Sequence, residues 1–239
     1  MSRLFLCALA LCCGAVRAAE PLTVLVDNGT EMPLARMEHG RLTGGIHYDL
    51  GMAIAGVLGR EARFVVLPRK RVEAALADGE ADVMCMYVPE WLPGPLDWTR
   101  PFMPFAEVVV TDRRAPRPAS LKALAGQRIG TVLGYRHPEI EAVLGKDFNR
   151  EDGPSAEANL QKMMAGRLQH VIASSIYISY RTHFGDPKLS IHEPLIVKSM
   201  RLQCAISRKG HVKADDVSRA TARLVRDGEI DRILKRYGD

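Results

Sequence analysis

Two series of strand-like apolar runs and helix-like segments follow one another along the chain, and a proline-rich stretch separates them. The first series spans residues 22–86, and the second begins at Gln127. The prolines between them include Pro89, Pro93, Pro95, Pro101 and Pro104. Because proline lacks an N–H and fixes φ, this stretch cannot continue a helix. Strands that alternate with helices favour a parallel-rich sheet, so we expect two α/β units.

The expected elements follow from hydrophobic spacing. Short apolar runs that end in turn residues predict strands at 22–27, 63–67, 81–86, 106–112, 127–133, 170–173 and 200–207. Apolar residues at helical spacing predict helices at 48–58, 71–78, 137–144, 156–165, 175–183, 213–227 and 229–237.

The first residues have the features of a secretory signal peptide. Ser2-Arg3 is a short positive start, Leu4 to Val16 is uncharged and mostly apolar, and Val16-Arg17-Ala18 suits cleavage before Ala19. The apolar stretch is too short to span a bilayer of about 30 Å as a helix. Residues 1–18 are therefore predicted to be a cleaved signal peptide that directs the protein to the periplasm. A buried N-terminal helix is the alternative.

Composition indicates a globular protein. The chain has 239 residues, of which 47% are hydrophobic and 26% charged, and a formal net charge of +5. Loss of residues 1–18 would remove Arg3 and Arg17 and no acid, which lowers the charge to +3. These values exclude a disordered chain. The basic excess is scattered and aromatic residues are only 6%, so no nucleic-acid partner is expected.

Cys85 and Cys204 are the cysteines that remain after such cleavage. In an oxidising compartment they could form a disulfide or stay as buried thiols, and spacing does not decide between these states. The seven histidines are dispersed without a metal-ligand pattern. No metal and no cofactor are therefore expected.

Short motifs in a fixed order carry a family resemblance. Together they resemble the family 3 periplasmic solute-binding proteins, the polar amino-acid receptors of ABC importers. The motifs are Gly45-Ile-His-Tyr-Asp-Leu50, Gly79-Glu-Ala-Asp-Val83, Asp97-Trp-Thr-Arg-Pro-Phe102, Leu124-Ala-Gly-Gln-Arg-Ile-Gly130 and Asp227-Gly-Glu-Ile230. The resemblance covers essentially all of the chain after the predicted signal peptide.

The resemblance implies an α/β fold of the type II periplasmic-binding-protein class, a two-lobe clamshell that closes on its ligand. Lobe 1 would hold residues 19–106 and 203–239, and lobe 2 residues 107–202. Strand ends and helix starts would meet between the lobes, where a small polar ligand can bind. It also places the strands of Cys85 and Cys204 side by side, which would permit a disulfide within lobe 1.

Two positions depart from the family pattern. Trp91 stands where amino-acid binders carry an arginine for the ligand carboxylate, and Ser174 stands where they carry an aspartate for the amino group. Tryptophan can stack on a flat ligand but cannot pair with a carboxylate. The resemblance, with these departures, predicts a ligand other than an ordinary α-amino acid.

Other residues could replace the missing arginine. Arg71, or else Arg69, could clamp an anion at the start of a helix, a place where positive charge opposes the helix dipole. The alternative is a solvated basic helix start. Tyr135 and Arg136 open a helix in lobe 2, where free N–H groups attract anions. They could contact ligand or form a surface turn.

Further candidates follow the strands of lobe 1. Asn28, Glu31 and Tyr87 come after strands whose ends would face the other lobe, with loop packing as the alternative. Trp91 could stack on ligand or pack on the proline-rich crossing. The predicted ligand-binding set is therefore Asn28, Glu31, Arg69, Arg71, Tyr87, Trp91, Tyr135, Arg136 and Ser174.

These features predict a monomeric solute-binding protein that captures a small, polar, anionic ligand for an ABC permease. A ligand sensor that reports to a membrane receptor is an alternative within binding. A dehydratase-like enzyme on the same scaffold is a third possibility, and it would need a general acid such as Glu31 or Glu90. Neither carboxylate has a motif around it, so no enzymatic activity is expected.

Overall fold

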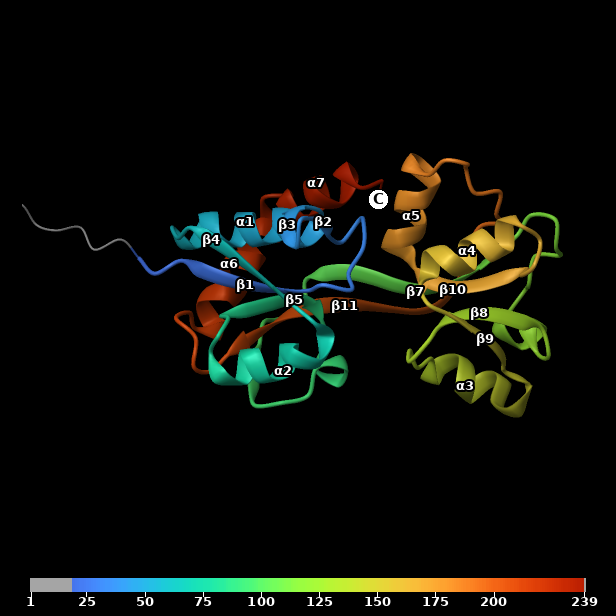
Figure 1. The fold of residues 1–239 in the computed structure, drawn as a ribbon, viewed down its shortest axis with the longest axis horizontal. Coiled ribbons are helices and arrows are strands. Elements are labelled where there is room, and N and C mark those ends of the chain that lie inside the picture. Colours follow the sequence, from blue (N-terminus) through green and yellow to red (C-terminus); the bar gives the residue numbers. More distant parts are fainter. Residues whose placement is uncertain (1–18, 239) are drawn as a thin grey trace, which may run out of the picture.

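A computed structural model describes residues 19–238 of the chain. The predicted signal peptide lies outside the described residues. Two α/β lobes lie side by side, and two long strands, β7 (Met103–Thr111) and β11 (Leu195–Ser207), run from one to the other (Figure 1). The expected two-lobe α/β fold is confirmed.

Lobe 1 is built on a sheet with three parallel strands. β4 (Ala62–Leu67) is the edge strand, β1 (Leu22–Asp27) lies next to it, and β5 (Val83–Tyr87) follows. The last part of β11 pairs antiparallel with β5, and β6 (Leu96–Trp98) pairs antiparallel with β11. Because the three parallel strands point the same way, their carboxyl ends meet at one edge of the lobe.

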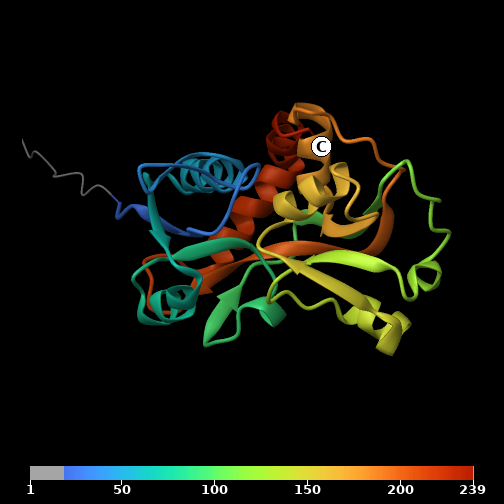
Figure 2. The ribbon, with the colours of Figure 1, turned by 45° about the vertical axis from the view of Figure 1, so that its right-hand side comes forward.

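Helices cover both faces of the lobe 1 sheet, as Figure 2 also shows. α1 (Ile46–Leu58), α6 (Ala214–Arg226) and α7 (Glu229–Arg236) share one core with the sheet, and α2 (Arg69–Asp78) packs in a second core on the other side. In α1 the buried Ile46, Leu50 and Ile54 recur at helical spacing, and Gly59 ends the helix in the left-handed conformation that glycine adopts readily.

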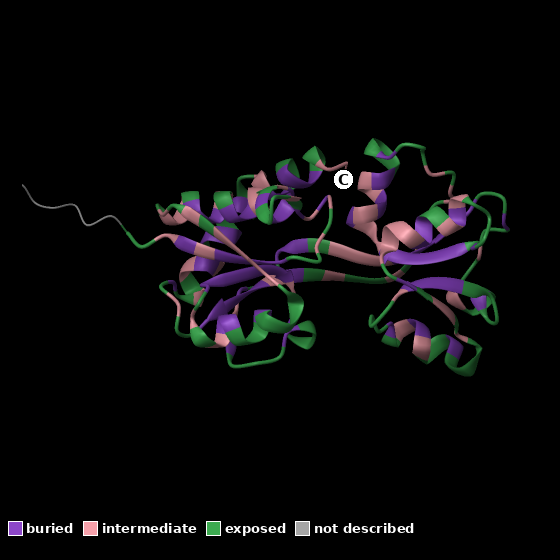
Figure 3. Ribbon diagram, in the orientation of Figure 1, coloured by how far each residue is buried: buried purple, intermediate pink, exposed green. Residues whose placement is uncertain are grey.

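Lobe 2 repeats the pattern. β9 (Asn149–Gly153), β8 (Arg128–Val132) and β10 (His170–Ser174) are parallel, and β7 pairs antiparallel with β10. Three helices flank these strands: α3 (Pro138–Leu144), α4 (Ala156–Met164) and α5 (Ser175–Phe184). Buried residues cluster within each lobe, whereas the stretch of β7 and β11 between the lobes is intermediate or exposed (Figure 3).

The sequence patterns locate the longer elements but miss several short ones. The unpredicted elements are the hairpin of β2 (Arg36–Glu38) and β3 (Arg41–Gly44), β6, β9, and the one-turn helices Pro89–Trp91, Leu121–Leu124 and Gly145–Asp147. Most have few apolar residues, so hydrophobic alternation cannot reveal them. β11 begins at Leu195 rather than at residue 200, because its first half pairs with β7.

β7 and β11 form the connection between the lobes. Their antiparallel register runs from Leu195 opposite Val109 to Leu202 opposite Met103. β11 then continues along β5 of lobe 1, while β7 continues along β10 of lobe 2. The lobe boundaries predicted from sequence, 19–106 with 203–239 and 107–202, fall within or beside these two strands and stay a prediction.

A disulfide joins Cys85 of β5 to Cys204 of β11. The two residues are paired in the strand register, and both are buried. The sequence did not decide between a disulfide and two free thiols, and the structure has the disulfide. It closes a loop across a sequence separation of 119 residues and therefore ties the returning strand to lobe 1.

We expect the double substitution Cys85→Ala and Cys204→Ala to destabilise the protein. A cross-link that closes a loop of this length restricts the unfolded chain, which stabilises the fold by up to about 5 kcal/mol. Urea denaturation should therefore give a lower free energy of unfolding for the variant. Wild-type protein unfolded and refolded in reductant is the control and should match the variant. Equal stability of the oxidised wild type and the variant would contradict this role.

His47, at the start of α1, is 4% exposed. Burial lowers the pKa of its imidazole from 6.5 to about 4, because the charged form loses its hydration. The unfolded chain therefore binds a proton below pH 6.5 that the folded chain does not bind until pH nears 4.

This difference predicts that the free energy of unfolding falls by about 3 kcal/mol as the pH drops from 6.5 to 4. The stability is fully present above pH 6.5. His47→Gln should remove most of this slope in urea denaturation at pH 7, 5.5 and 4.5, whereas His39→Gln, at an exposed position, should retain it. A slope that persists unchanged in His47→Gln would refute the assignment.

Candidate functional site

Side chains of three elements, including the predicted Tyr87 and Arg69, gather where the strands of lobe 1 end. Asp27 is the last residue of β1, Tyr87 is the last of β5, and Arg69 begins α2 two residues after β4. In parallel α/β sheets, ligands bind at the carboxyl ends of the strands, because the side chains of several loops converge there. These residues and their neighbours are called the interlobe site below.

Arg69 is held in place by its neighbours but retains free donors. Its Nη2 donates a hydrogen bond of 2.7 Å to the backbone carbonyl of Trp91, and its guanidinium carbon lies 5.4 Å from the centre of the Tyr87 ring. The side chain is exposed, and no ion pair joins it to a carboxylate within residues 19–238. A guanidinium has five N–H donors, so Arg69 can bind an anion in addition to these contacts.

Aromatic rings form a wall beside Arg69. The Trp91 ring is edge-on to Tyr87 at 6.4 Å and to Phe105 at 5.7 Å. Trp91 is nevertheless 41% exposed, which leaves ring surface on which a ligand could stack. Burial raises the pKa of the Tyr87 hydroxyl to about 12, and the charge of Asp27 adds to this effect while Arg69 opposes it. Tyr87 is therefore a neutral hydrogen-bonding group at physiological pH.

Arg71 points elsewhere. It lies 3.6 Å from Glu80, and both side chains are exposed. Glu80 precedes β5, at the end of the sheet opposite to Tyr87. The role predicted for Arg71 stays a prediction, and these contacts favour Arg69 as the anion clamp.

Tyr135 is the predicted lobe 2 residue that lies near the interlobe site. It lies in the loop between β8 and α3 and is 64% exposed. The surrounding protein still removes part of the hydration of its hydroxyl and raises its pKa, and the negative charges of Asp27 and Glu31 add to the rise while Arg69 opposes it. Charges on lobe 1 therefore act on a lobe 2 side chain, as expected of residues that face one another.

The remaining predicted residues have different surroundings. Ser174 caps α5, and its hydroxyl accepts the N–H of Tyr177. Asn28 and Glu31 are exposed in the turn after β1, where backbone groups of both make hydrogen bonds. Arg136 is exposed and has no side-chain partner among residues 19–238. Binding roles for these four residues stay predictions.

Sequence reasoning missed two residues of the site. Asp27 is 9% exposed and accepts the N–H of Gly29 at 2.8 Å. It could have been found, because the residue that ends a parallel strand faces the site, but only its neighbour Asn28 was chosen. Phe105 lies on β7 and contacts Trp91 through the fold, so no local sequence signal marks it.

No cluster of three or more histidine, cysteine or acidic side chains suited to a metal ion occurs in the described part of the chain. None of the helices described is long and apolar enough to cross a membrane.

Comparisons with solved structures agree with the fold. An ancestral arginine-binding protein bound to arginine superposes with a TM-score of 0.70 at 20% identity, with 92% of this chain and 98% of that chain covered. The GluR0 ligand-binding core complex with L-glutamate gives 0.74 at 16% identity, with 95% and 100% covered. The L-cystine solute receptor of Neisseria gonorrhoeae, in its unliganded open conformation, gives 0.68 at 18% identity, with 92% and 93% covered. A search of curated protein sequences finds no match.

The family comparison covers nearly the whole described chain. The profile of the bacterial extracellular solute-binding proteins, family 3, matches residues 22–239. The two-lobe fold and the order of its elements agree with this match. The chain belongs to family 3 of the bacterial extracellular solute-binding proteins.

Proposed function

We propose that the protein binds a small, polar, anionic solute between its lobes in the periplasm and presents it to an ABC importer. The observation that carries this proposal is the exposed guanidinium of Arg69, which has no carboxylate partner within residues 19–238, bonds the Trp91 carbonyl and lies over the Tyr87 ring. An anionic group would bind Arg69, and a flat or apolar part of the solute would stack on Trp91.

The solute is proposed to differ from an ordinary α-amino acid. The similar structures named above are described with arginine and L-glutamate bound, or as an L-cystine receptor. In this chain Trp91 replaces the arginine expected to hold a carboxylate. Ser174 replaces the expected aspartate, and its hydroxyl is engaged in capping α5. Neither residue can supply the charge that an amino-acid zwitterion needs.

Closure of the lobes would follow from solute contacts on both sides. Arg69 and Trp91 belong to lobe 1 and Tyr135 to lobe 2, and β7 and β11 connect the two. A solute that touches both lobes only when they are close shifts the population toward the closed form. The same event could inform a membrane sensor, which is the second proposed use of the site.

Binding without chemical conversion is the proposed mode. Glu31 and Glu90 are both exposed to solvent. A general acid usually acts within hydrogen-bond reach of a substrate in a site that excludes water. Exposure of both carboxylates therefore supports a binding protein rather than a dehydratase.

A thermal-shift screen against small carboxylates, phosphates, amines and α-amino acids tests this function. We expect the largest rise in melting temperature with a non-amino-acid anion, because a ligand that binds only the folded state stabilises it. Mass spectrometry after incubation should recover that compound unchanged. Stabilisation by a common α-amino acid would contradict the proposed ligand class, and conversion of the compound would indicate an enzyme.

Arg69→Ala should weaken binding of the best anion by about 1.5–3 kcal/mol, which corresponds to roughly 10–100-fold in Kd, because it removes charged hydrogen bonds. Arg71→Ala is a matched control, since it removes the same charge two residues away on the same helix. It should change Kd by less than about twofold, measured by isothermal titration calorimetry. A larger effect of Arg71→Ala than of Arg69→Ala would reverse the assignment.

A further inference from the structure

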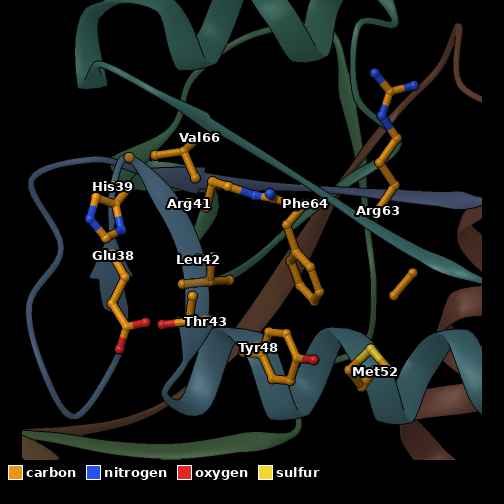
Figure 4. Close-up of a pocket in the computed structure, with 12 residues that line it drawn as sticks. Glu38, His39, Arg41, Leu42, Thr43, Tyr48, Met52, Arg63, Phe64 and Val66 are labelled. Carbon is orange, nitrogen blue, oxygen red and sulfur yellow. The ribbon is translucent and has the colours of Figure 1, made fainter.

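A groove opens at the outer edge of lobe 1 and shares no residue with the interlobe site. It lies between β3 and β4, over α1, and has a volume of about 1080 Å³ (Figure 4). Its lining includes Arg41, Leu42, Tyr48, Met52, Phe64 and Val66. We call it the edge groove.

Both long walls of the edge groove are strand edges that pair with no further strand of the described chain. Within residues 19–238, β4 is the first strand in the sheet order and pairs only with β1, while β3 pairs only with β2. The carbonyls of Glu61 and Leu67, which flank or end β4, accept N–H groups of Leu22 and Asn28. Because backbone direction alternates along a strand, the intervening Ala62, Phe64 and Val66 direct their N–H and C=O groups away from β1.

These outward backbone groups are available for pairing. Within residues 19–238, no hydrogen bond joins β4 to a strand other than β1. An open strand edge of this kind can accept an extended chain as an additional strand. The occupant that the open edge of β4 fits is therefore a polypeptide in extended conformation.

The floor of the edge groove is apolar. Tyr48 of α1 stacks on Phe64 of β4 with 5.0 Å between ring centres, and Leu42 is buried beside them. Met52, one helical turn after Tyr48 on the same face of α1, is 46% exposed. Figure 4 shows Tyr48 and Met52 rising from the helix below the two strands. Alternate side chains of an added strand point to one face, so an apolar residue at one such position could reach this floor.

Unpaired positive charge lies along the edge groove. Arg41 extends toward Phe64 across the groove, whereas Arg63 of β4 points away from α1, on the opposite face of the sheet from Phe64 (Figure 4). Both are exposed, and neither has an ion pair within the described residues. Glu38 is the acidic residue in the lining, and His39 lies next to it. The balance favours acidic side chains on the occupant near Arg41 and Arg63.

We propose that the edge groove docks an extended, acidic segment of a partner protein, which adds to β4 as a strand and places an apolar side chain over Tyr48, Met52 and Phe64. This surface is independent of the solute site, so its partner can be engaged whether or not solute is bound.

Selection from a phage-displayed library of random twelve-residue peptides tests this surface. Enriched peptides should combine acidic residues with alternating apolar ones, and a synthetic copy should protect the Ala62, Phe64 and Val66 amides from hydrogen exchange. The double variant Arg41→Glu and Arg63→Glu should bind that peptide at least about tenfold more weakly, and so should Met52→Glu. The double variant Arg100→Glu and Arg167→Glu, which reverses two other exposed arginines, is the matched control and should bind normally.

Several results would overturn the proposal: no enrichment of peptides, enrichment of basic peptides, or binding that leaves these amides unprotected. Unchanged peptide binding by the double variant Arg41→Glu and Arg63→Glu would also overturn it. Concentration-dependent dimerisation of the protein that these two substitutions abolish would assign the edge groove to a second copy of the chain instead.

Discussion

The antiparallel pairing of β7 with β11 is the constraint on which the rest of the structure depends. Each strand continues into the sheet of a different lobe, so hydrogen-bonded strand pairs run without a break from the sheet of lobe 1 to that of lobe 2. The strand ends of lobe 1 and the β8–α3 loop of lobe 2 consequently meet at the interlobe site. The disulfide between Cys85 and Cys204 reinforces the lobe 1 end of this connection. In the proposed closure, the lobes would move about these two strands.

The interlobe site combines positive charge, aromatic surface and uncharged hydroxyls. Arg69 provides the guanidinium, Trp91 and Phe105 provide the wall, and Tyr87 and Tyr135 provide hydroxyls whose pKa values are raised. The negative charge of Asp27 adds to the rise in both pKa values. This arrangement supports selection by the shape and charge of a solute rather than by a zwitterion cradle.

Sequence patterns predict the fold well and the site only in part. Apolar spacing locates the long helices and most of the parallel strands, but β2, β3 and β9 are short and mostly polar, so hydrophobic alternation does not reveal them. For the site, the sequence predicts a helix start at residue 71 and favours Arg71 over Arg69 as the anion clamp. The helix begins at Arg69, so both arginines are helical. In a helix of 3.6 residues per turn, side chains two positions apart point to nearly opposite sides. Phe105 reaches Trp91 only through the folded crossing, so its part in the site required three-dimensional information.

A crystal structure of the protein with its most stabilising small anion would locate the solute directly. We expect the anion between Arg69 and Trp91, with the Tyr135 loop closer to lobe 1 than in the unliganded protein. A bound α-amino acid whose carboxylate and amino group are both held by charged side chains would contradict the account. An anion bound outside the interlobe site, with the lobes unmoved, would contradict it as well.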